Sequence, residues 1–223
     1  MNSKYRKAFP PQLLYVFVLI NFNIFAQTST LGLEVNKLSK YIASNKFKEL
    51  KLKMHDNERT DTLFEKALEI TNGNYREALF ALTFTVIPYN YVPIKIPLIN
   101  VVFNYPLISA CENVFDLKNK NLPKYLFFSS PTDNFGDKDK LAHFFGSAFL
   151  SYSNNIFDLT ELIGYFVEVF EQYFKVQSSI DPRDIHADTL GDLFGRLLKE
   201  NKKVFPSQLM MMKTLFYCRF NIP

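Results

Sequence analysis

Apolar side chains recur at helical spacing in the first third of the chain. Between Leu33 and Met54 they form a loose stripe bordered by lysines, which predicts a helix. The interval 58–74 predicts a second helix that begins at Thr60 or Asp61. An Asn-Gly pair closes this interval, and both residue types readily take the left-handed conformation that ends helices.

A third helix is expected directly after that pair. Asn74 can cap its start, because an asparagine side chain accepts a hydrogen bond from the free backbone N–H groups of a first turn. Pro88 is expected to end it, because proline lacks an N–H group and clashes with the preceding turn.

The interval that follows is apolar and rich in proline. From Ala78 to Cys111 the only charged residue is Lys95, and four prolines interrupt the run, so it does not predict a spanning helix. Its β-branched residues favour an irregular or short β segment near 90–108, with edge strands that tolerate proline. Two interpretations stay open: a surface that rests on a membrane or a partner, or a buried wrap around the helices.

The C-terminal part has the pattern of a helical bundle. A linker at 121–137 leads into helices expected near 139–153, 158–175 and 182–200. Asp139 stands at the expected N-cap of the first of them. Four small residues predict close contact between helices: Gly146, Ala148, Gly191 and Gly195.

Composition fits one folded domain. The chain has 223 residues, of which 48% are hydrophobic and 22% charged, so it can bury a core. The predicted fold class is therefore mainly α, a single-domain helical bundle with the β segment named above. Residues 27–136 would form an N-terminal helical part, and residues 137–223 the C-terminal bundle.

Residues 1–26 have the composition of a secretory signal peptide. Lys4, Arg6 and Lys7 precede an apolar run that ends at Ala26 and is shorter than the roughly 20 residues of a spanning helix. We expect cleavage near Ala26 and export to the periplasm; a retained membrane anchor is the alternative. Without this segment 23 basic residues face 22 acidic ones, which is not the charge excess of a nucleic-acid-binding protein.

Cys111 and Cys218 are the only cysteines of the chain. In an exported protein they could pair and close a loop of about 100 residues. The alternative is two buried free thiols. Neither has the neighbouring second ligand that a cysteine metal site would need.

Five polar residues of the C-terminal helices are candidates for one shared site. Asp139 and His143 are four residues apart and share a helix face, as do Asp184 and Asp188. Glu168 lies on the polar stripe of the intervening helix. We therefore expect His143 to contact at least one of Glu168, Asp184 and Asp188 on the other helices.

Two interpretations of this cluster stay open. In the structural one the acids cap helices or form ion pairs: Lys140 pairs with a glutamate, and Asp192 pairs with Arg196. In the chemical one the cluster acts as a general acid/base pair or binds one divalent ion such as Mn²⁺ or Zn²⁺. The ligands would then be His143, Glu168, Asp184 and Asp188.

The spacing of these residues resembles the pattern of VanZ-like proteins and of small periplasmic YfiM-like lipoproteins. The resemblance covers residues 137–196 and rests on Asp139-Lys140-x-x-His143-Phe144, Glu168-x-x-Glu171 and Asp184-x-x-x-Asp188-x-x-Gly191-x-x-x-Gly195. VanZ-like proteins usually carry glutamine at the place of Glu171 and asparagine at that of Asp188, and they span the membrane. The YfiM-like group carries a lipidation cysteine that is missing here. The resemblance implies work in the cell envelope without naming a reaction.

Two function classes follow. The first is a non-enzymatic exported protein of the cell envelope whose polar network fixes the register of its helices, with a peripheral membrane or envelope partner. The second is a metal-dependent hydrolase that acts on a lipid- or sugar-linked envelope substrate. The first class needs no cofactor, whereas the second needs one divalent metal ion.

Overall fold

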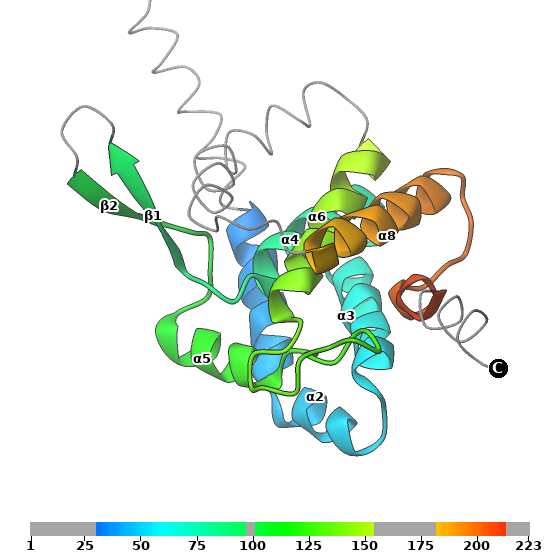
Figure 1. Cartoon of the computed structure of the whole chain (residues 1–223), viewed down its shortest axis with the longest axis horizontal. Coiled ribbons are helices and arrows are strands. Elements are labelled where there is room, and N and C mark those ends of the chain that lie inside the picture. The colour runs from blue at the N-terminus through cyan, green and yellow to red at the C-terminus, as the bar shows by residue number, and fades with distance from the viewer. Residues whose placement is uncertain (1–29, 97–100, 154–181, 213–223) are drawn as a thin grey trace, which may run out of the picture.

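Helices dominate the part of the chain that the computed structural model describes, residues 30–96, 101–153 and 182–212 (Figure 1). A short β-hairpin is added to them. The predicted fold class, mainly α with a short β segment, is confirmed. The expected signal peptide, the expected helix near 158–175 and Cys218 lie outside the described residues.

The first predicted helical stripe is interrupted. A helix covers residues 30–43 and a bend follows at Ser44. After the bend come α2 (Asn45–Glu49) and the 3-10 turn η1 (Leu50–Leu52). The Ser44 side chain accepts a hydrogen bond from Phe47 N at 3.2 Å and so starts a new helix. A serine hydroxyl competes for backbone donors in this way, which is why the apolar stripe alone did not show the break.

Helix α3 (Asp56–Ile70) begins earlier than expected. Glu58 reaches back and accepts the His55 N–H at 2.8 Å, which stabilises the first turn. The predicted start at Thr60 or Asp61 is therefore wrong. Its end is confirmed, because both residues of the Asn-Gly pair have positive φ angles.

Helix α4 (Tyr75–Val86) lies at the centre of the fold. As predicted, the Asn74 side chain accepts a hydrogen bond from Glu77 N, and the helix ends just before Pro88. Nine of its residues are buried, because it packs against both α3 and α6 (Lys138–Ser153). Figure 1 shows it behind α6, in the middle of the molecule.

The β segment is an antiparallel hairpin that projects from the helices (Figure 1). Strand β1 (Tyr91–Ile96) pairs with β2 (Val101–Pro106), so both strands are edges and tolerate their prolines. Tyr91 and Val102 are 54% and 59% exposed, which does not fit a buried wrap around the helices. No helix in the described ranges combines the length and apolar character that crossing a membrane requires.

Helix α5 (Glu112–Asn121) was not predicted. It carries Lys118, whose buried ammonium group donates hydrogen bonds to the carbonyl groups of Thr85 and Ile87 at 2.9 and 2.8 Å. Burial lowers the pKa of Lys118 to about 7. Cys111 precedes the helix as an exposed free thiol, so the expectation of a buried thiol is wrong there.

Helices α6 and α8 (Pro182–Lys199) confirm two of the three helices predicted for the C-terminal part. They pack side by side along much of their length (Figure 1). A last described helix, at 206–212, docks on α3 through Asp61. That carboxylate accepts hydrogen bonds from the backbone N–H and the hydroxyl of Ser207, at 2.8 and 2.6 Å.

Candidate functional site

The candidate cluster lies where α6 and α8 approach most closely. A Cβ atom on Gly191 would overlap the carbonyl oxygen of Phe144, and one on Gly195 would overlap that of Ala148. The predicted close contact through small residues is therefore confirmed for these two glycines. It brings the polar side chains of both helices within hydrogen-bonding reach of one another.

Lys140 joins the first turns of the two helices. Its side chain is almost fully buried, and Nζ lies 2.7 Å from Asp139 Oδ2 and 2.5 Å from Asp184 Oδ1. Burial alone would lower the pKa of Lys140, but its hydrogen bonds to Asp139 and Asp184 raise it overall. These two partners are aspartates, and the expected pairing with a glutamate stays a prediction because Glu168 and Glu171 lie outside the described residues.

His143 lies between the two candidate aspartates of α8, as predicted. Its Nδ1 atom is 3.2 Å from Asp188 Oδ1, and Nε2 is 3.5 Å from Asp184 Oδ1. Asp188 Oδ1 also accepts the Ser147 hydroxyl at 2.8 Å. One carboxylate of α8 thus holds two side chains of α6.

Further contacts continue this polar ladder toward both ends of the helix pair. Arg183 Nη1 lies 3.3 Å from Asp137 Oδ1, just before α6 begins. At the other end the Ser151 hydroxyl donates to the Asp192 carbonyl group at 2.9 Å. We use "the α6–α8 ladder" for these contacts together with those of Lys140, His143 and Ser147.

Asp139 is not the N-cap of α6. The helix begins at Lys138, so Asp137 takes the position before it and is fully buried. The Asp137 carboxylate accepts hydrogen bonds from Leu126 N at 3.3 Å and from the Ser130 hydroxyl. Burial raises the pKa of Asp137, although these hydrogen bonds and Arg183 oppose the rise.

The remaining candidates fall into two groups. Asp192 pairs with Arg196 at 2.9 Å, as predicted for residues four apart on an exposed helix face. Glu168 and Glu171 lie outside the described residues, so their place in the cluster stays a prediction.

Residues that sequence reasoning missed complete the site. Asp137, Arg183 and Ser147 each connect the two helices or the linker before them. Ser147 could have been found from its spacing, because it lies four residues after His143 on the same face of α6. Asp137 and Arg183 are 46 residues apart in the sequence and come together only when the chain folds. No local sequence pattern therefore predicts their contact.

The described contacts of the cluster are ion pairs and hydrogen bonds. Among the described residues, no group of three or more His, Cys, Asp or Glu side chains is placed to hold a metal ion. The ammonium group of Lys140 lies between Asp139 and Asp184 and supplies the positive charge that pairs with both carboxylates.

His143 gives the ladder a testable pH dependence. Burial lowers its pKa, but the hydrogen bond and charge of Asp188 and the charge of Asp184 raise it overall above the ordinary value of 6.5, against a smaller opposing effect of Lys140. A raised folded-state pKa means that protonated His143 stabilises the fold fully below about pH 6.5, and that this contribution is lost as pH rises through the folded-state value.

We therefore expect the stability advantage of the parent over His143→Gln to be largest below pH 6.5 and to shrink as the pH rises above that value. Urea denaturation of both proteins on either side of that pH measures the difference. A constant or growing difference as the pH rises would contradict a charged His143.

No protein-family model, curated protein or solved structure matches the chain. The resemblance to VanZ-like and YfiM-like proteins over residues 137–196 therefore stays a prediction.

Proposed function

We propose that the protein is an exported, non-enzymatic module of the cell envelope, in which the α6–α8 ladder fixes the register of two closely packed helices. The observation that carries the proposal is Lys140, whose buried ammonium group bridges Asp139 on its own helix and Asp184 on the other. Export and the envelope location rest on the composition of residues 1–26 and on the resemblance over residues 137–196.

Register control follows from the mixture of contacts on one interface. Gly191 and Gly195 let the backbones touch but would also let the helices slide, because glycine has no side chain to interlock. The paired charges remove that freedom, since a slide of one turn would separate each ion pair and leave charges buried without partners. Polar groups that specify register at some cost in stability are known from coiled coils.

The competing proposal is a metal-dependent hydrolase, and one observation favours it. His143 contacts two carboxylates, Asp184 and Asp188, and an imidazole with carboxylates is a usual ligand set for Zn²⁺ or Mn²⁺. Glu168 would have to supply a further oxygen ligand.

Substitution of His143 by alanine separates the two proposals. We expect His143→Ala to lower the free energy of unfolding by about 1–3 kcal/mol, because it removes one partner of buried Asp184 and one partner of half-buried Asp188. The loss should be the same with and without a metal chelator. Melting of parent and variant in both conditions measures it.

Thr189→Ala is the matched control on α8. Its hydroxyl is exposed and donates only to the carbonyl group of Ile185 in the same helix, so little change is expected. If the parent melts lower in chelator and His143→Ala does not respond, a bound ion stabilises the site and the hydrolase proposal replaces ours.

A further inference from the structure

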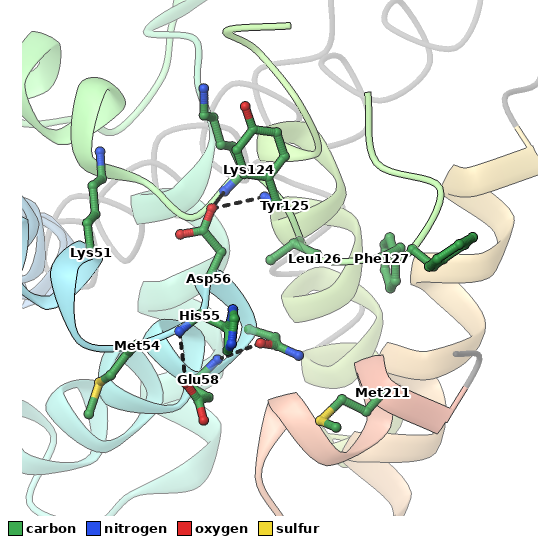
Figure 2. Close-up of a pocket in the computed structure, with 12 residues that line it drawn as sticks. Lys51, Met54, His55, Asp56, Glu58, Lys124, Tyr125, Leu126, Phe127 and Met211 are labelled. Atoms are coloured by element: carbon green, nitrogen blue, oxygen red, sulfur yellow. Dashed lines mark hydrogen bonds between the residues drawn. The ribbon is translucent and has the colours of Figure 1, made fainter. Parts of the chain in front are cut away.

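A pocket of about 550 Å³ opens on the side of the molecule formed by the start of α3, the linker after α5 and the helix at 206–212 (Figure 2). This volume is within the usual range of roughly 300–1,000 Å³ for small-molecule sites. The pocket shares no lining residue with the α6–α8 ladder. The pocket is therefore separate from the residues on which the proposed function rests.

Six of the twelve residues that line the pocket are apolar or aromatic. Met54 lines it from the bend before α3, Met211 from the helix at 206–212, and Leu126, Phe127 and Phe128 from the linker. Phe128 is 74% exposed, and both methionines are also exposed. Exposed apolar side chains that gather around one hollow mark a binding surface more often than scattered ones do. Methionines suit a flexible ligand, because their side chains adapt to its shape.

Positive charge gathers at the same pocket. Lys51 and Lys124 both line it, and Figure 2 shows them apart from Phe127 and Met211. Burial and then Arg59 lower the pKa of Lys51, nearby Asp56 opposes this, and Lys124 and Lys138 lower it further. Burial has the largest effect on this pKa, and the smaller effects of Arg59, Lys124 and Lys138 reflect positive charge around Lys51, where an anion would be stabilised.

The acidic residues of the pocket are already engaged. Asp56 forms an ion pair with buried Arg59, and its other oxygen accepts the backbone N–H groups of Lys124 and Tyr125 at 2.9 and 3.0 Å. These contacts with Lys124 and Tyr125 are visible in Figure 2. Glu58 accepts the His55 N–H. The ammonium group of Lys51 donates one hydrogen bond, to the Lys120 carbonyl group, of the three that an ammonium can make.

We propose that this pocket binds an anionic single-chain amphiphile, with its carboxylate at Lys51 and Lys124 and its alkyl chain along Phe127, Phe128 and Met211. Separation of charge and apolar wall within one hollow fits a ligand with one charged end and one apolar end. A neutral apolar ligand would leave the lysines unused, and a small inorganic anion would leave the apolar wall exposed.

The test uses the full chain and dodecanoate below its critical micelle concentration, followed by calorimetric titration. We expect saturable binding to one site per chain, and binding of the cationic amphiphile dodecyltrimethylammonium at least about tenfold weaker. The double variant Lys51→Gln/Lys124→Gln should weaken dodecanoate about tenfold or more, since it removes both charges and keeps polar donors. Phe128→Ser should weaken it about fivefold, through lost apolar contact.

The matched control is Lys40→Gln/Lys203→Gln, which removes the same charge from two exposed lysines outside the pocket. It should bind within about twofold of the parent, and melting curves should show that every variant is folded. The proposal is overturned if dodecanoate does not saturate one site, if the cationic amphiphile binds equally well, or if the pocket variants bind like the control. Binding to anionic phospholipid vesicles without binding of dodecanoate would also overturn it, in favour of a membrane-docking surface.

Discussion

Gly191→Ala is expected to lower the free energy of unfolding by about 3 kcal/mol or more, because the added methyl group must displace a backbone. Its Cβ would overlap the Phe144 carbonyl oxygen of α6, and neither helix can relieve the overlap by changing a rotamer. The helices must instead move apart, which also stretches the ion pairs of Lys140 and His143. Gly195→Ala should behave in the same way against Ala148.

Gly146→Ala provides the control within the same helix pair. A Cβ there would lie 3.5 Å from Thr83 Cγ2, an ordinary van der Waals contact. Alanine is favoured over glycine inside a helix by up to about 1 kcal/mol, so this variant should be as stable as the parent or more so. Urea denaturation followed by circular dichroism compares the three. Equal stability of Gly191→Ala and the parent would show that α6 and α8 are not in backbone contact.

Local signals predicted the ends of helices better than their beginnings. The end of α3 and both ends of α4 follow from asparagine, glycine and proline, which act through their own backbone conformations. The start of α3 was misplaced because Thr60 and Asp61 look like caps. Asp61 does act as a cap, but for the helix at 206–212, through Ser207. The sequence alone does not distinguish a side chain that caps a distant helix from one that caps the helix in which it lies.

Long-range contacts also explain why α5 was missed. Its sequence is polar, and its buried positions include Lys118 and Asn121, which a hydrophobic pattern assigns to solvent. Lys118 is buried because the carbonyl groups at the end of α4 accept its ammonium protons, and Asn121 because its amide donates to the Ile42 carbonyl group. The carbonyl groups that accept these hydrogen bonds belong to residues far from α5 along the chain.

The residues of the candidate site also differ in whether local sequence patterns could predict them. Four-residue spacings placed His143, Asp184 and Asp188 on facing helices, and the structure brings them together. Asp137 was missed because it belongs to a linker that folds back on itself. Gly136, with φ of 61°, and a hydrogen bond from Asp137 N to the Lys124 carbonyl group make that return. Such a turn depends on which distant backbone it meets.

Arg59→Met is expected to cost about 3–5 kcal/mol, the usual range for removing one partner of a buried ion pair. The Arg59 side chain is fully buried, pairs with Asp56, donates to the Asn121 carbonyl group and lies over the Phe47 ring. Methionine keeps most of the volume, so the loss reports the uncompensated charge of Asp56 and the unsatisfied carbonyl group. Chemical denaturation at neutral pH measures it.

Arg196→Met removes an Arg–Asp pair of the same type from an exposed place. Arg196 and Asp192 are 68% and 42% exposed, and surface pairs contribute about 0–1 kcal/mol, so the expected change is small. The double variant Asp56→Asn/Arg59→Met tests the cause, because asparagine keeps an acceptor for Lys124 N and Tyr125 N but carries no charge. It should regain part of the stability that Arg59→Met loses. If it is instead less stable than Arg59→Met, the cost lies in packing over Phe47 and not in the charge of Asp56.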